Sequence, residues 1–250
     1  MAIAARVQAV FDRLVMRLPS GRTEFFNPDD FEWIRDIEAR ADEIAEELDA
    51  LLANVDSLPN FQDIQEEQIT ITQDDRWKVF LLYGYGARAE ESCRRCPRTA
   101  ELVESIPGMT TAMFSVMLPH KHIPAHVGPW KGVLRYHLAL RTPTDEQSAR
   151  IRVGTSVQHW RKGKSMLFDD TFEHEAWNDS DETRVVLFVD VLRDLPWYLS
   201  IVNRGFIGLI RSSPFVKRAL ANSEAWRETL PPPPAAVPAA RAPVKTAAGE

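Results

Sequence analysis

The stretch that decides the fold runs from Ser115 to Arg135 and reads SVMLPHKHIPAHVGPWKGVLR. All six histidines of the chain lie in this stretch or follow it within the same central segment: His120, His122, His126, His137, His159 and His174. Neutral imidazole is the commonest protein ligand for transition metals of intermediate softness. Because packing alone gives no reason to crowd histidines, the segment predicts a metal site, and His126 is its first candidate.

The bulk properties are those of a soluble globular protein. The 250 residues are 44% hydrophobic and 26% charged, with a net charge of -6 at pH 7, and this length can bury a substantial core. The acidic balance and the lack of a dense Lys/Arg stripe exclude a nucleic-acid binder. No apolar run reaches the ~20 residues of a membrane span. Arg6, Asp12 and Arg17 interrupt the apolar N-terminus, so it lacks a signal-peptide core. We therefore expect a cytoplasmic protein.

The two cysteines form a single CRRC motif, Cys93 and Cys96. A zinc ribbon would need a second pair or histidines at ligand spacing, and a redox motif would need a strand-to-helix context. We interpret both cysteines as free thiols of a reducing compartment.

Two amphipathic helices are predicted in the N-terminal part. Apolar residues recur at helical spacing from Ile3 to Leu18, which gives a basic helix that packs on the domain or lies on a membrane surface. A second helix begins after Asn27, where two aspartates favour a helix N-terminus, and runs to about Asn54. Its carboxylates spread around the helix, so we expect a solvated acidic face rather than a metal site.

The middle of the chain predicts many short strands. A β-like run at residues 68–72 (QITIT) and another at 77–86 (WKVFLLYGYG) precede a helical or irregular segment at 90–104. Further strands are expected at Thr111–Leu118, Val133–Leu140, Ala149–Val153, Ser156–Trp160, Ser165–Phe168 and Arg184–Leu192. Turn residues separate them, and short strands at near-regular spacing favour a β-sandwich or barrel over a parallel α/β sheet.

These patterns divide the chain into four parts. Residues 1–68 are a helical region that packs on the core, and residues 69–195 are the β core. Residues 196–230 mix aromatic and aliphatic residues with arginine and lysine. They favour one or two helices that cover the barrel, or a basic apolar surface that meets lipid or a partner. Residues 231–250 are rich in Pro and Ala and predict a disordered tail.

Two strands place charged residues inside the predicted barrel. In VLRYHLAL, Arg135 and His137 share one face, opposite a full apolar set. In RVVLFVDVL, Arg184 shares a face with Asp190. A buried arginine needs an anionic partner. An acidic side chain or a small dicarboxylate ligand would serve, because the planar guanidinium binds a carboxylate through two hydrogen bonds.

The histidines fit an iron site incompletely. A non-haem iron oxygenase usually presents two histidines and one carboxylate on one face of the metal. The usual near motif is His-x-Asp, but Gly128 stands at its third position after His126. Asp169 and Asp170, shortly before His174, could supply a carboxylate, although we favour roles in a turn or in orienting a ligand imidazole. We interpret His120 and His122 as loop residues near the mouth of the pocket, and His159 as a strand residue without a ligand role.

Blocks of sequence in a fixed order carry a family resemblance. They are FSVMLPHKHIPAHVGPWKGVLRYHLAL, IRVG, WRKG, FDDTFEHEAWN and RVVLFVDV, all between Trp77 and Pro196. Together they resemble the aspartyl/asparaginyl β-hydroxylase family of 2-oxoglutarate-dependent dioxygenases. The resemblance implies a mainly β fold with flanking helices, built on a double-stranded β-helix (a cupin-like jelly roll). It also implies an enzyme that uses Fe(II), 2-oxoglutarate and O2 to hydroxylate an unactivated C–H bond, with release of succinate and CO2.

The resemblance assigns the metal ligands. His126 and His174 match the two iron-binding histidines. Gly128 matches the peptide hydroxylases of the family, which have glycine where the lipid A hydroxylases tend to keep an aspartate. Water would then fill the vacant position. His120 departs from the family, which usually has glycine there.

The resemblance also assigns the co-substrate site. Arg184, ten residues after the second ligand, and Ser115 match the pair that binds the far carboxylate of 2-oxoglutarate. Arg135 and His137 match a pair near the carboxylate that chelates iron.

The substrate stays open at this point. Gly128 favours an Asp or Asn side chain of a peptide or protein. The amphipathic N-terminus and the apolar basic stretch after Pro196 suggest a lipid acyl chain, with peripheral contact at the inner membrane face, and the blocks LRYHL and CPRT look closer to the bacterial lipid hydroxylases. A small amino-acid metabolite is a third option. A non-catalytic ligand-binding jelly roll is the alternative of another class, and the complete set of matched site residues argues against it.

Overall fold

The computed structural model describes residues 2–65 and 70–225. Its strands are β1 (Phe25–Phe26), β2 (Trp77–Gly84), β3 (Ala87–Arg88), β4 (Met109–Met117), β5 (Lys121–His126), β6 (Val133–Arg141), β7 (Ala149–Val153), β8 (Ser156–His159), β9 (Ser165–Phe168), β10 (His174–Asn178) and β11 (Arg184–Leu192). Its α-helices are α1 (Ala2–Val15), α2 (Glu32–Ala39), α3 (Ala41–Leu52), α4 (Phe61–Ile64), α5 (Glu90–Arg95), α6 (Pro97–Ser105), α7 (Trp197–Arg211) and α8 (Pro214–Ala225). Short 3-10 turns lie at Pro19–Arg22, Pro28–Asp30, Val55–Ser57 and Glu146–Ser148.

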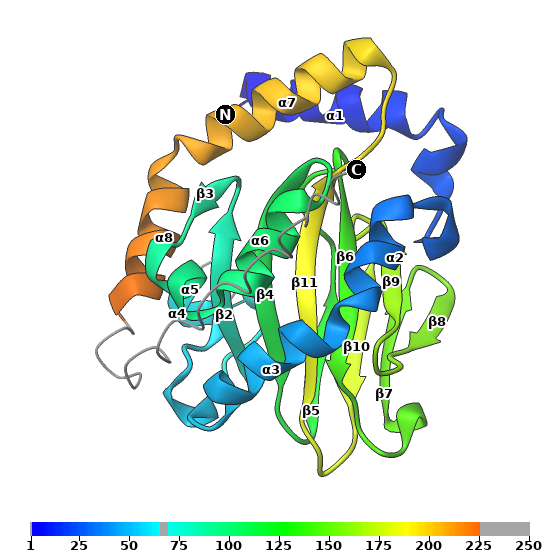
Figure 1. The fold of residues 1–250 in the computed structure, drawn as a ribbon. Helices are drawn as coiled ribbons and strands as arrows, with labels where there is room; N and C mark the ends of the chain where they lie inside the picture. Colours follow the sequence, from blue (N-terminus) through cyan, green and yellow to red (C-terminus); the bar gives the residue numbers. More distant parts are fainter. Residues whose placement is uncertain (1, 66–69, 226–250) are drawn as a thin grey trace, which may run out of the picture.

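Two antiparallel sheets face each other (Figure 1). The larger has the strand order β1-β9-β6-β11-β4-β2-β3, and the smaller has the order β5-β10-β7-β8. Apolar residues of both sheets meet in one buried cluster between them, which includes Phe188 of β11 and Ile151 of β7. This arrangement is the jelly roll that the sequence predicted.

The larger sheet is buried on both faces. Leu134, Tyr136 and Leu138 of β6 belong to the cluster beneath the helices, whereas Ala139 belongs to the cluster between the sheets. Helices α2 and α3 cross the outer face of this sheet (Figure 1). The two faces predicted for β6 are therefore confirmed, and Arg135 and His137 take the inner one, where they line the cavity between the sheets.

A third apolar cluster fixes α1 and α7 at one end of the barrel, at the top of Figure 1. At its centre the Trp130 ring stacks on Phe11 of α1, with ring centroids 4.4 Å apart. It also stacks on Phe206 of α7 at 3.9 Å. The indole N–H donates to Asn203 Oδ1 at 2.7 Å. One tryptophan thus joins α1, α7 and the barrel.

The structure corrects several expectations. The long acidic helix is interrupted at Arg40, whose φ of -110° and ψ of 16° separate α2 from α3. Residues 70–72 of QITIT form a turn, while residues 68 and 69 lie outside the described residues, as does the predicted tail. Strands β5 and β10 were not predicted.

Cys93 and Cys96 are free and buried, and burial raises the pKa of both thiols.

The expectation of a fully solvated acidic helix was wrong at Glu47. This carboxylate is buried and accepts hydrogen bonds from the backbone N–H groups of Arg98 and Thr99, both at 2.9 Å, and from the Thr99 hydroxyl at 2.7 Å. Those N–H groups begin α6, where a helix has no internal acceptors for them. Glu47 of α3 therefore caps α6.

Replacing Glu47 with alanine should lower the free energy of unfolding by about 2–3 kcal/mol, because it leaves buried donors without an acceptor. Urea unfolding followed by circular dichroism measures the change. The neighbouring Glu46→Ala is the control, since its exposed ion pair with Arg98 contributes about 0–1 kcal/mol. Equal losses in the two variants would contradict the capping role.

Candidate active site

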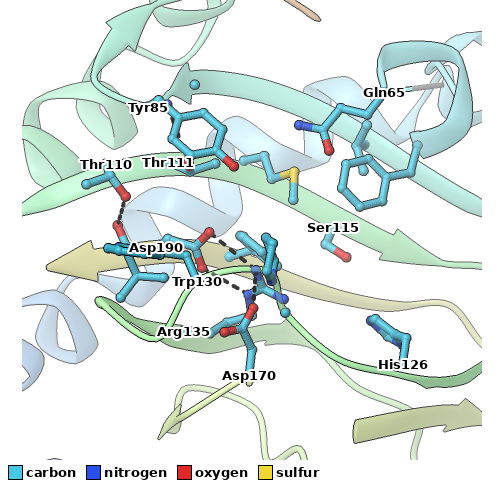
Figure 2. Close-up of a pocket in the computed structure, with 18 of the residues that line it drawn as sticks. Gln65, Tyr85, Thr110, Thr111, Ser115, His126, Trp130, Arg135, Asp170 and Asp190 are labelled. Atoms are coloured by element: carbon cyan, nitrogen blue, oxygen red, sulfur yellow. Dashed lines mark hydrogen bonds and ion pairs between the residues drawn. The ribbon is translucent and has the colours of Figure 1, made fainter. Parts of the chain in front are cut away.

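The inner face of the jelly roll encloses a cavity of about 590 Å³, a volume typical of a small-molecule site. Strand β11 runs along it with Arg184 and Asp190 on one face. The six-residue separation places their backbones roughly 20 Å apart. His137 lies between them, opposite Phe188 in the register of β6 and β11. Figure 2 shows part of the polar lining of the cavity.

The two predicted ligand histidines lie side by side. Strand pairing places His126 of β5 opposite His174 of β10, and their ring centroids are 4.0 Å apart. The Nδ1 atom of His126 donates to the Pro124 carbonyl at 2.8 Å, and that of His174 donates to the Phe172 carbonyl at 3.0 Å. These hydrogen bonds fix both rings and leave Nε2 as the ligating nitrogen.

Both imidazoles are held in the neutral form that binds metals. Burial lowers the pKa of His126, although the hydrogen bond to Pro124 opposes the shift. Burial and then the neighbouring His126 lower the pKa of His174 to about 3. Among the described residues, no group of three or more His, Cys, Asp or Glu side chains is placed to hold a metal ion. As candidate metal ligands, the described residues of this cavity thus offer a pair of histidines.

The space beside Gly128 belongs to Asp170. The Gly128 N–H donates to the Asp170 carbonyl at 2.7 Å, and a Cβ at position 128 would lie 2.1 Å from Asp170 Oδ2. Glycine is therefore required at position 128, because the Asp170 carboxylate fills the space that the side chain of any other residue would take. Burial raises the pKa of Asp170, and Arg135 opposes the shift.

Arg135 is held between two carboxylates (Figure 2). Its Nη2 lies 2.9 Å from Asp170 Oδ2, and its Nε donates to Asp190 Oδ1 at 2.9 Å. Burial alone would lower the pKa of Arg135, but Asp170 and Asp190 raise it above its ordinary value. The guanidinium therefore positions Asp170, and direct binding of a co-substrate carboxylate by Arg135 stays a prediction.

Arg184 is a buried cation without an acidic partner among the described residues. Its Nη1 donates to the Ser115 carbonyl at 3.2 Å, and Nη2 contacts the Met117 sulfur. The Nε atom has no hydrogen-bond partner in the described part of the chain. The guanidinium lies 4.2 Å from the centroid of the Trp160 ring, and burial lowers its pKa to about 9. Such a group calls for an anionic ligand.

Unused polar atoms surround Arg184. Within the described residues, neither ring nitrogen of His137 nor Nε1 of Trp160 has a hydrogen-bond partner, although all are buried. The Ser115 hydroxyl accepts from Trp77 Nε1 at 3.1 Å, so its own proton is free to donate. Buried polar atoms are normally paired. This set therefore forms a site for a small polar ligand.

The rest of the cavity wall is largely apolar. Many of its aromatic and aliphatic residues come from β2, α4, α7 and α8, and others come from the inner faces of the two sheets. They include Phe61, Ile64, Leu81, Phe206, Ile207, Ile210, Phe215 and Val216. The cavity thus joins a polar, cationic region near Arg184 to an apolar wall.

Comparison with known proteins identifies the family. The family model of aspartyl/asparaginyl β-hydroxylase matches residues 38–194. This chain belongs to the aspartyl/asparaginyl β-hydroxylase family. The ornithine lipid ester-linked acyl 2-hydroxylase of Rhizobium tropici is 44% identical over 208 residues, which are 83% of this chain and 74% of that protein. Human aspartyl/asparaginyl β-hydroxylase is 35% identical over 130 residues, 50% of this chain and 17% of that protein. Among solved structures, the Schizosaccharomyces pombe Cnp3 cupin domain covers 54% of this chain and 74% of its own, at 12% identity and a TM-score of 0.34.

The remaining histidines of this β-hydroxylase family member lie outside the lining of the cavity. His120 has a φ of 58°, in the left-handed region that glycine adopts without strain, and the Asp181 carboxylate lies 2.9 Å from its Nε2. His122 lies 2.7 Å from Glu175, and its ring stacks on Trp177. His159 ends β8. His120 lies in a turn and His159 in a strand, as predicted, but His122, which was expected in a loop near the mouth of the pocket, lies within β5.

Two residues of the β-hydroxylase site were missed or underrated from sequence. Trp160 was quoted in a matching block without a role, yet its ring covers the Arg184 guanidinium. Asp170 was expected in a turn or beside a ligand imidazole. In the structure its carboxylate occupies the space next to Gly128 that a side chain at position 128 would need. The signal for Trp160 was its place in the WRKG block. No signal in the sequence links Asp170 to Gly128.

Proposed function

We propose that this β-hydroxylase family member uses Fe(II) and 2-oxoglutarate to hydroxylate a lipid acyl chain. One observation carries the proposal: a single cavity contains a pair of neutral histidines, an arginine that is buried without an acidic partner in the described part of the chain, and an apolar wall. Each feature suits one participant, respectively the metal, the dicarboxylate and the acyl chain.

The metal would be held by Nε2 of His126 and His174. Bound Fe(II) would supply the activation of O2, which amino-acid side chains cannot perform. The Asp170 carboxylate lies in the space beside Gly128, and apart from the ion pair with Arg135 neither of its oxygens has a hydrogen-bond partner within the described residues. Arg135 thus holds this carboxylate in place, where it could accept a hydrogen bond from water beside a bound metal.

The co-substrate would be held around Arg184. A guanidinium binds a carboxylate through two parallel hydrogen bonds, and the Ser115 hydroxyl supplies another donor. His137, whose pKa burial lowers far below its ordinary value, offers one N–H donor and one acceptor. Trp160 offers its N–H and closes the site against water with its ring. This donor set fits the two carboxylates and the keto oxygen of 2-oxoglutarate.

The acyl chain fits the apolar wall. Long hydrocarbon chains have no groups for hydrogen bonding, so their binding depends on buried apolar surface, which β2, α4, α7 and α8 provide. The relative from Rhizobium tropici, a lipid acyl 2-hydroxylase by name, matches most of this chain. Both points favour a lipid over the other substrate classes.

A peptide Asp or Asn side chain, the first substrate hypothesis from the sequence, has less support. Its motivation was Gly128, and the Asp170 carboxylate gives that glycine a steric reason that is independent of substrate. Of the cations that line the cavity, Arg135 is engaged by two carboxylates and Arg184 is assigned to the co-substrate. Among the described residues that line the cavity, an acidic peptide side chain would find no further cation.

The reaction consumes one O2 for each hydroxylated carbon. One oxygen atom replaces the C–H bond with C–OH, and the other enters the new carboxylate of succinate, while 2-oxoglutarate loses CO2. The protein binds the two carbon substrates, excludes water and fixes their orientation.

An assay that compares two candidate substrates tests the proposal. The purified chain is supplied with Fe(II), 2-oxoglutarate and O2, together with either an ornithine lipid that has an ester-linked acyl chain or a peptide with Asp and Asn side chains. We expect succinate only with the lipid, and a hydroxylated acyl chain in its mass spectrum. Succinate formation with the peptide but not with the lipid would overturn the substrate assignment. Binding of 2-oxoglutarate without turnover of either would favour the non-catalytic jelly roll.

A further inference from the structure

The exposed apolar side chains gather at one end of the molecule. In the described residues, ten large hydrophobic side chains are exposed. One is Val157 on β8. The other nine lie on or just after α1, in the loop after β5, and on α7: Val7, Val10, Met16, Val127, Trp197, Tyr198, Ile201, Val202 and Leu209. Figure 1 shows α1 and α7 together at that end, and both pack on Trp130. We call these nine residues the end patch.

Helix α7 is apolar on both sides. Its inner residues Leu199 and Ile207 are buried, and Phe206 lines the cavity. On its outer side, Trp197 and Leu209 are exposed by 75% and 74%. A helix that covers a core normally turns polar residues to water, so this outer face indicates a partner. Because Val127 belongs both to the end patch and to the cavity lining, the surface continues into the site.

The charge around the end patch has the opposite sign to that of the whole chain. Residues 2–17 and 197–211 contain five arginines, all exposed: Arg6, Arg13, Arg17, Arg204 and Arg211. The only acidic residue in these two ranges is Asp12, which is half-buried near Lys131, and burial raises its pKa. The chain as a whole has a net charge of -6. Apolar and aromatic residues bordered by arginines are typical of helices that lie in an anionic bilayer interface.

We propose that the end patch docks on the surface of an anionic lipid bilayer, with α1 and α7 in the interface plane. This inference rests on the proposed function, because it gives an acyl chain a dry route from the bilayer into the cavity. Trp197 and Tyr198 suit the boundary, where one end of an aromatic side chain is apolar and the other is wet. None of the described helices is long and apolar enough to cross a membrane. A second copy of the chain is a poorer occupant, since it would bring its own five arginines against these.

Vesicle flotation tests the docking surface. The full chain, without iron or 2-oxoglutarate, is mixed with phosphatidylcholine vesicles or with vesicles that also contain phosphatidylglycerol. We expect binding to the anionic vesicles that weakens as salt is added. The affinity of the double variant Ile201→Glu/Leu209→Glu for these vesicles should be at least about tenfold lower, because the variant places two carboxylates in the interface. Val157→Glu makes the same change on β8 and should bind like the wild type.

Two controls separate the outcomes. Circular dichroism and gel filtration check that the variants fold and whether the wild type is a dimer. Absence of wild-type binding, equal binding by the double variant, or a dimer that the double variant breaks would each overturn the docking surface. Succinate formation with lipid in detergent micelles is measured separately. Neither Ile201 nor Leu209 lines the cavity, so micellar turnover should survive in the double variant. Vesicle binding without any turnover would instead refute the proposed function and leave the docking surface standing.

Discussion

Replacing Arg184 with methionine should have two opposite effects. The ligand-free protein should become more stable to heat, because a buried cation that has no acidic partner among the described residues is replaced by an apolar side chain of similar volume. At the same time 2-oxoglutarate should bind more weakly by about 2–5 kcal/mol, or roughly 30-fold or more, since its far carboxylate would lose the buried cation that we propose binds it.

Thermal unfolding without ligand and calorimetric titration with 2-oxoglutarate measure the two effects. Arg184→Lys is the control, because it keeps the charge but loses the two-pronged hydrogen bonding, and its affinity should fall between those of the wild type and Arg184→Met. A less stable Arg184→Met protein with unchanged affinity would show that the arginine has a structural role instead.

Replacing His174 with alanine should remove one of the two metal ligands that we propose. Loss of an outer hydrogen-bonding partner of a metal site typically costs about 10- to 100-fold in affinity or activity, so loss of a ligand should cost at least about 100-fold. Fe(II) titration and succinate formation measure the effect. His122→Ala is the matched control, since its ring pairs with Glu175 outside the cavity lining. Equal iron affinity in the two variants would place the metal elsewhere.

The sequence predicted the β core well where both faces of a strand are distinctive. In β6 and β11 the alternation separated a polar interior from an apolar outer face, and the structure has both. Strand β5 was missed because its residues Lys121–His126 include Pro124, and because its two buried side chains, Lys121 and Ile123, do not form an apolar alternation. Strand β10 lies next to it in the smaller sheet and has no long apolar run of its own.

The candidate site was predicted in its parts but not in its contacts. Resemblance named both histidines and Arg184, and the structure brings them into one cavity. The placement of Asp170 against Gly128 depends on a close approach between two loops, which strand periodicity does not specify. The burial of Glu47 depends in the same way on the position of α6. Such contacts are made by tertiary packing, and local pattern does not encode them.

In the proposed reaction, this cavity couples 2-oxoglutarate decarboxylation to acyl-chain hydroxylation. Turnover of an ornithine lipid under isotopically labelled O2, followed by mass spectrometry of lipid and succinate, tests it most directly. We predict one labelled oxygen in the hydroxyl group of the acyl chain and one in succinate, in equal amounts. Succinate without hydroxylated lipid, or a lipid hydroxyl group without label, would contradict the claim.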